Sequence, residues 1–200
     1  MSGLAQQEYF AGFGDPVHEA QACFRSLMEA MSRPGSIVEV DGPCEVPAPL
    51  SPVMASVALT LCDYETPIGL VGELGTNAVA GYLRFHTSAP VVDDLTEAAF
   101  VFLPNVSALP DLGTMRPGTA SYPDKSATIV IDAGSFGTGL VVDLSGPGIE
   151  THVCFSATGL DASFWRHAQA NHERYPLGLD IIFCGPNAIA ALPRSTKIEA

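Results

Sequence analysis

Apolar residues recur at helical spacing from position 17 to position 31, and the flanking residues carry start and stop signals for a helix. Asp15 can accept hydrogen bonds from the free amides of a first turn, and Pro16 suits a position that needs no amide hydrogen. Arg33-Pro34-Gly35 ends the run. The pattern predicts an amphipathic helix whose buried stripe consists of Val17, Ala20, Phe24, Leu27, Met28 and Met31.

Similar signals elsewhere predict three more helices and six strands. The further helices are expected over 53–62, 76–83 and 161–175, beginning at Ser51-Pro52, at Thr76 or Asn77, and at Asp161. Short apolar runs predict strands over 68–71, 100–103, 127–131, 140–144, 152–155 and 181–184. Because helices and strands intermix along the chain, we expect one α/β domain over residues 1–200, with a mixed central sheet flanked by helices.

A glycine-rich segment, Gly134-Ser135-Phe136-Gly137-Thr138-Gly139, separates two of these strands. Its spacing differs from the dinucleotide fingerprint, which places G-x-G-x-x-G at the start of a helix, and this segment leads into a strand instead. We therefore interpret it as a turn. It predicts a hairpin between the strands that end at Ile131 and begin at Leu140, and hence at least one antiparallel pair.

The composition narrows the classes of function. Hydrophobic residues make up 47% of the 200 positions, whereas charged residues make up 16%, below the roughly 25% that is usual. Part of the surface is therefore expected to face another subunit. Nine Lys and Arg against 22 Asp and Glu give a net charge of −13, which repels nucleic acid and anionic lipid, so neither is expected as a partner.

Cysteine usage and the chain's start indicate a soluble, cytoplasmic protein. The five cysteines are scattered and form no C-x-x-C pair, as is typical of reduced thiols: Cys23, Cys44, Cys62, Cys154 and Cys184. The first ten residues lack the basic and apolar regions of a signal peptide. The longest apolar stretch, 54–62, falls far short of the roughly 20 residues that span a bilayer.

Two short segments carry groups that could hold an anion. In Ser145-Gly146-Pro147-Gly148 the glycines would let backbone amides converge on a ligand, although a tight turn between strands is the alternative. Arg84-Phe85-His86-Thr87 combines a cation, an imidazole and a hydroxyl. Here the alternative is a helix-end arginine paired with an acid, and a locally bonded His86.

Neither a metal nor a cofactor is expected. His152 and Cys154 would share one face of a strand, but no further ligands stand at a recognisable spacing. Pyridoxal phosphate requires a lysine, and the chain has two. Lys125 lies in a turn-like stretch and Lys197 lies where chains usually fray, so a working pyridoxal site is not expected.

Taken together, the segments resemble the PhnH family, a subunit of the bacterial machinery that cleaves carbon-phosphorus bonds. The resemblance runs from about 12 to 199 and rests on GFGDPVHEAQACFRSLMEAMSRPG, LTLCDYETP, LRFHT, SYPDKSAT, SGPGI, ERYPLGLDIIF and LPRST. LMEAMSRPG and YPLGLDIIF are the most distinctive of these words. Ser195 departs from the threonine expected there.

The resemblance implies a fold similar to the large domain of pyridoxal-phosphate-dependent transferases, but without their lysine. It implies a homodimer that joins sister subunits in a carbon-phosphorus lyase core complex. That complex forms a ribose 1-phosphonate 5-triphosphate from ATP and an alkylphosphonate, with loss of adenine.

Two roles follow for this subunit: a structural subunit that organises the complex, or an enzyme subunit that binds nucleotide or phosphonate directly. A pyridoxal enzyme that works alone is a third hypothesis, from outside the family. No catalytic residue can be assigned. The candidate anion-contacting set is Arg84, His86, Gly146, Gly148 and Arg194, and the alternative is that all five are structural or interface groups.

Overall fold

The computed structural model describes residues 10–43 and 45–199, and it contains the four helices that the sequence predicts. They are α1 (Pro16–Ser32), α2 (Pro52–Leu61), α3 (Asn77–Thr87) and α4 (Ala162–His172). Each begins where a side chain accepts a hydrogen bond from a first-turn amide, and the four caps are Asp15, Ser51, Thr76 and Asp161. Local capping therefore determines where each helix starts.

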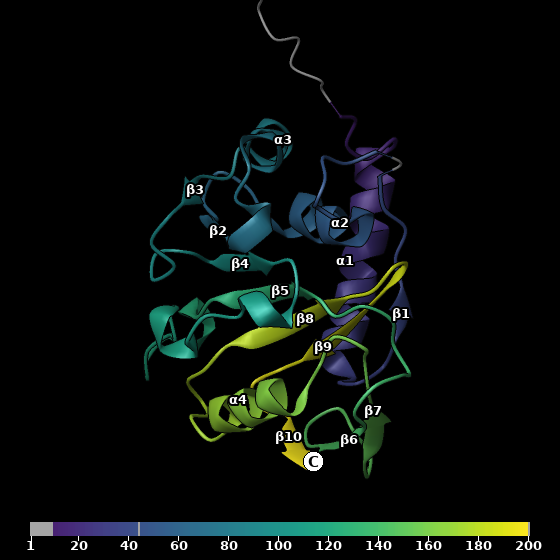
Figure 1. Cartoon of the computed structure of the whole chain (residues 1–200), viewed down its shortest axis with the longest axis vertical. Helices are drawn as coiled ribbons and strands as arrows, with labels where there is room; N and C mark the ends of the chain where they lie inside the picture. Colours follow the sequence, from purple (N-terminus) through teal and green to yellow (C-terminus); the bar gives the residue numbers. More distant parts are fainter. Residues whose placement is uncertain (1–9, 44, 200) are drawn as a thin grey trace, which may run out of the picture.

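A seven-stranded mixed sheet forms the centre of the molecule (Figure 1). Its strands are β1 (Val38–Glu39), β2 (Ile68–Leu70), β3 (Val91–Val92), β4 (Phe100–Leu103), β5 (Thr128–Asp132), β8 (Asp180–Cys184) and β9 (Ala188–Leu192). They lie in the order β1-β9-β8-β5-β4-β2-β3. The neighbours from β3 to β8 are parallel, and β9 runs antiparallel to both β8 and β1. The expected mixed α/β architecture is confirmed.

A second, three-stranded sheet consists of β6 (Val142–Ser145), β7 (Val153–Phe155) and β10 (Lys197–Glu199). The expected hairpin across 135–139 is wrong, because β5 and β6 belong to different sheets. Both edges of β5 are already paired, with β4 and β8, so β6 finds no free edge there. It pairs with β7 and β10 instead. Lys197, expected in a frayed end, belongs to β10.

Hydrophobic side chains fill a layer on each face of the larger sheet. Phe102, Val130 and Ile182 face the layer that contains the buried residues of α1, α2 and α3. Ile129 and Phe183, one position away along β5 and β8, face the layer that contains those of α4 and the three-stranded sheet. This alternation follows from the two-residue period of a strand. Figure 1 shows α3 and α4 on opposite sides of the sheet.

The predicted stripe of α1 needs correction. Cys23, Leu27 and Ala30 are the buried residues, whereas Val17, Phe24 and Met28 are 76%, 47% and 58% exposed. The two sets point roughly 110° apart on the helix, at 100° per residue. Small side chains at 23 and 30 let α1 pack closely against α2 and β9. Of the predicted stripe, Leu27 is buried and Met31 packs against the core, whereas Val17, Phe24 and Met28 remain on the surface.

Candidate functional site

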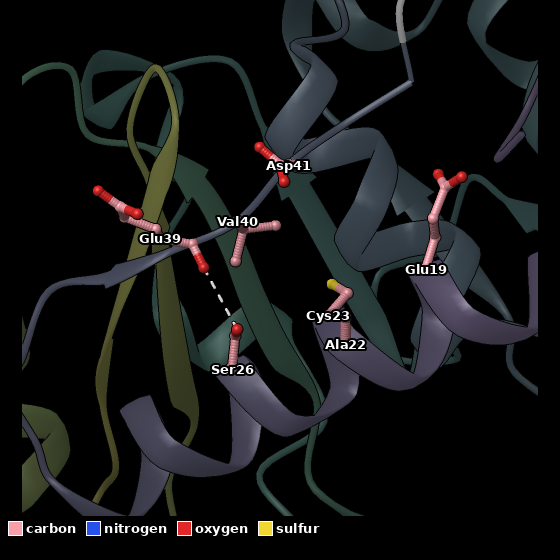
Figure 2. Close-up of a pocket in the computed structure, with 7 residues that line it drawn as sticks. All are labelled: Glu19, Ala22, Cys23, Ser26, Glu39, Val40 and Asp41. Atoms are coloured by element: carbon pink, nitrogen blue, oxygen red, sulfur yellow. Dashed lines mark hydrogen bonds between the residues drawn. The ribbon is translucent and has the colours of Figure 1, made fainter. Parts of the chain in front are cut away.

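A groove of about 370 Å³ lies between α1 and the segment that follows β1 (Figure 2). Glu19, Ala22, Cys23, Ser26, Glu39, Val40 and Asp41 line it. The Ser26 hydroxyl donates to the carbonyl oxygen of Glu39 at 3.2 Å and so ties α1 to β1. Three of the seven residues that line this groove are acidic, which gives it a negative potential. The groove is therefore unfavourable for phosphate or phosphonate, and sequence analysis did not identify it.

The thiols of the described residues are not activated nucleophiles. Cys23, Cys62 and Cys184 are buried free thiols, and Cys154 is an exposed one, while Cys44 lies outside the described residues. Burial raises the pKa of the Cys23 thiol, of the Cys62 thiol to about 12, and of the Cys184 thiol. Because the thiolate is the reactive form, these groups are inert at neutral pH.

Arg84 and His86 lie in the last turn of α3. The His86 ring joins its Nε2 to the carbonyl oxygen of Phe10 at 3.0 Å and makes edge contacts with the rings of Tyr82 and Phe85. A Cβ added to Gly12 would lie 2.8 Å from His86 Nδ1, so the imidazole packs directly on the 10–12 segment. Arg84 is exposed and has no ion pair within the described ranges. His86 thus fastens the N-terminal segment to α3.

Gly146 and Gly148 belong to the turn that connects β6 to β7. Their φ angles are +129° and +84°, a region that side-chain-bearing residues rarely adopt. A Cβ at Gly146 would approach Ser195 O to 3.1 Å, and one at Gly148 would lie 2.0 Å from Ser32 O. Backbone from the end of α1 and from the β9–β10 connection therefore occupies the space beside both glycines. The turn alternative accounts for them.

Arg194 has an interior role in the structure. Its Nη2 forms an ion pair with Asp180 Oδ2, its Nε donates to Asp180 Oδ1 at 3.1 Å, and its Nη1 donates to Pro123 O at 2.7 Å. His172 Nδ1 is bonded to the Arg194 carbonyl at 3.0 Å. The side chain of Arg194 is only 12% exposed. The guanidinium thus joins the start of β8 to the 123–125 turn, and the backbone carbonyl of Arg194 holds the end of α4.

The five predicted site residues do not form one site. Arg84 and His86 lie on α3, which covers one face of the large sheet. Gly146 and Gly148 lie beside the three-stranded sheet on the other face. The backbone beside Arg194 lies close to Gly146, through Ser195, but the Arg194 guanidinium points to Asp180 and Pro123.

The remaining chemistry-bearing groups are scattered. Among residues 10–43 and 45–199, no three His, Cys, Asp or Glu side chains gather so that they could hold a metal. Lys125 Nζ lies 4.6 Å from the ring centroid of Tyr122, and exposed Lys197 pairs with Glu199. In the same part of the chain, no helix is both long and apolar enough to cross a membrane.

Comparison with known proteins gives one consistent result. Residues 11–199 match the sequence model of a family described as bacterial phosphonate metabolism protein (PhnH). A Rhizobium meliloti protein named alpha-D-ribose 1-methylphosphonate 5-triphosphate synthase subunit PhnH is 37% identical over 196 residues, 98% of each chain. HtxG of Stutzerimonas stutzeri, provisionally named a C-P lyase subunit protein, is 29% identical over 179 residues, 90% of this chain and 85% of HtxG.

Proposed function

Because this chain belongs to the PhnH family of bacterial phosphonate metabolism proteins, we propose that it is a subunit of a carbon-phosphorus lyase core complex. In that complex it would serve the formation of a ribose 1-phosphonate 5-triphosphate from ATP and an alkylphosphonate. The observation that carries this proposal is the end-to-end match to a named synthase subunit of almost equal length. A match of that extent leaves little of the chain for a separate function.

Within the complex we assign the chain a structural role rather than a catalytic one. The internal contacts of His86, Gly146, Gly148 and Arg194 support this assignment, because each is used in packing the chain on itself. The carboxylates that line the groove beside α1 are also unsuited to anionic substrates. Arg84 is the one member of the predicted set whose side chain is open to solvent and available to a substrate.

A homodimer belongs to the same proposal. The exposed apolar residues of α1, namely Val17, Phe24 and Met28, form a stripe on one side of a helix. A stripe of this kind favours contact with another protein surface. The low charged fraction of the chain supports the same interpretation.

Three finer expectations also stay with the proposal. A likeness to the large domain of pyridoxal-phosphate-dependent transferases is supported by the seven-stranded sheet, in which β9 alone runs against the other strands. A cytoplasmic location is supported by the four free thiols of the described residues. We also treat residues 1–200 as one domain, in keeping with a sheet that takes strands from both ends of the described chain.

The test is complementation in a bacterium that lacks its own copy of this subunit and grows on methylphosphonate as the only phosphorus source. The tagged chain should restore growth and should co-purify with its sister subunits. Arg84→Ala should leave both unchanged, and His86→Ala should either do the same or lose assembly and growth together. Arg166→Ala, another exposed arginine, is the matched control.

Two results would count against this view. Failure of the wild-type chain to co-purify with any sister subunit would overturn the proposed subunit role. Intact complexes that lose at least about tenfold activity in both Arg84→Ala and His86→Ala, with Arg166→Ala unaffected, would instead assign Arg84 and His86 to the reaction and not to the structure; a lost charge-assisted contact has this size.

A further inference from the structure

Arg116 lies in an environment that no other cation of this protein shares. Of the nine Lys and Arg residues, only Arg116 and Arg194 are not exposed. Arg194 is paired with Asp180, but Arg116 has no ion pair with any described carboxylate. Its Nε is closed to solvent and has no hydrogen-bond partner among the described residues. Within residues 10–43 and 45–199, this half-buried guanidinium therefore has no counter-charge.

Such an arrangement is costly unless something compensates for it. Removing a charge from water carries a desolvation penalty, which is repaid only by acceptors of matching geometry. The planar guanidinium fork suits the oxygens of a phosphate, a phosphonate or a carboxylate. The part of Arg116 that remains exposed is where an anion from outside can reach it.

A second polar group without a described partner lies on the segment whose backbone adjoins Arg116. The amide of Ala127 donates to the Arg116 carbonyl at 2.7 Å, which places Ser126 on the adjoining segment. Ser126 is only 8% exposed, and its hydroxyl has no hydrogen-bond partner among the described residues. A buried hydroxyl normally finds a partner, so the Ser126 hydroxyl is a donor that a ligand oxygen could use. Lys125, the next residue, is exposed and adds a mobile positive charge.

The neighbouring segment adds further cationic and aromatic groups. Gly178 donates its amide to Pro117 O at 3.2 Å, which brings the end of α4 and its following turn alongside. Over 116–126, 172–180 and 194, the chain carries four of its nine basic residues but three of its 22 acidic ones. Asp180 and Arg194 neutralise each other, which leaves three basic and two acidic residues over these segments. In a chain of net charge −13, this junction is a place where an anion meets little repulsion.

We propose that Arg116, Ser126 and Lys125 form a binding site for a phosphorus oxyanion, that is, a phosphate or phosphonate group. Arg116 supplies the paired donors, Ser126 supplies a hydroxyl, and Lys125 supplies a flexible charge at the rim. Exposed Tyr122, whose ring already contacts Lys125, offers an aromatic face beside the site. The choice of phosphorus over carboxylate rests on the proposed role in phosphonate metabolism. The site would give the subunit direct contact with substrate while its scaffold role is kept.

The experiment is calorimetric titration of the full-length protein with methylphosphonate, inorganic phosphate and tripolyphosphate, each in separate runs. We expect saturable binding of at least one of them, weakened about tenfold to a hundredfold in Arg116→Met. Arg116→Lys keeps the charge but loses the planar guanidinium fork, so its affinity for the anion should fall between those of the wild type and Arg116→Met. Arg25→Ala removes one exposed charge on α1 and is the matched control, expected within about twofold of wild type.

Thermal unfolding of the same variants gives a readout that a merely structural arginine would not produce. Without ligand, Arg116→Met should melt at the wild-type temperature or above it, because an uncompensated half-buried charge is removed. With ligand, only proteins that retain Arg116 should gain stability. Ser126→Ala, which retains Arg116, should lose less binding than Arg116→Met and should gain less stability with ligand than the wild type does.

Several outcomes would overturn the site. The first is that none of the three anions binds saturably at concentrations up to about 10 mM, ten times a millimolar Kd. The second is that Arg116→Met binds as tightly as Arg25→Ala. The third is that ligand-free Arg116→Met melts at a lower temperature than the wild type. Failure of the site is distinguishable from failure of the subunit role. A chain that binds methylphosphonate through Arg116 but never co-purifies with sister subunits would keep the site and remove the subunit proposal.

Discussion

Replacing Gly148 by alanine tests whether this glycine serves the packing of the chain or the binding of a ligand. Gly148 adopts φ +84°, and a Cβ there would lie 2.0 Å from Ser32 O and 3.1 Å from Pro34 Cδ. Gly137 offers a matched control, since it adopts φ +80° and a Cβ there would meet nothing within 4 Å. The two positions share the same backbone conformation and differ in the contact.

The magnitudes follow from that difference. A left-handed alanine costs about 1 to 2 kcal/mol, of which about 0.4 to 1 kcal/mol is regained because the unfolded chain is less flexible. Gly137→Ala should therefore cost from near zero to about 1.5 kcal/mol. Gly148→Ala carries the same balance plus the displacement of the end of α1, for which overpacking costs of about 1 to 3 kcal/mol are usual. We expect Gly148→Ala to be less stable than Gly137→Ala by about 1 to 3 kcal/mol.

Urea denaturation followed by tryptophan fluorescence measures this difference. The single tryptophan, Trp165 of α4, is 1% exposed in the layer between α4 and the large sheet, so unfolding changes its surroundings completely. The slopes of the two transitions must agree for the midpoints to be compared. A difference below about 0.5 kcal/mol would refute the packing argument. Wild-type stability of Gly148→Ala together with weakened phosphonate binding would return this glycine to the ligand site.

Two further predictions concern α1 and the exposed thiol. Phe24→Glu should convert the proposed dimer into a monomer near 20.9 kDa with unchanged circular dichroism. Leu27→Ala should stay dimeric and lose about 2 to 5 kcal/mol of unfolding free energy. If light scattering finds Phe24→Glu dimeric, this surface is not the dimer interface. In a Cys44→Ser background, alkylation of Cys154 should be slow at pH 8 and accelerate as pH rises. The hydrogen bond and charge of Asp143 raise the pKa of this thiol, so Asp143→Asn should lower it and speed the reaction, and an unchanged rate would contradict the contact.

Local structure was readable because its causes lie within a few residues. Asp15, Ser51, Thr76 and Asp161 each bond an amide three residues ahead, so the start of each helix depends on its neighbours in the chain alone. The apolar runs at 100–103 and 181–184 likewise mark strands covered on both faces. Mixed α/β character and the family resemblance followed from such segments.

Pairing between distant segments was decided by tertiary structure. The apolar run at 188–192 predicted no strand because alanine has a weak strand preference, yet its small side chains let α1 pack across β9. The turn at 135–139 resembled a hairpin, but the occupied edges of β5 sent β6 to another sheet.

The same limit applies to the candidate site. The sequence singled out Arg194 and His86, but it could not reveal that Asp180 and Phe10 O already engage them. Arg116 carried no motif and became notable only because folding leaves its guanidinium half-buried with no described carboxylate paired to it. Whether a charge has a partner depends on residues that are distant in sequence and adjacent only after folding. The sequence therefore determines which charged groups are present, and the tertiary structure determines which of them remain unpaired.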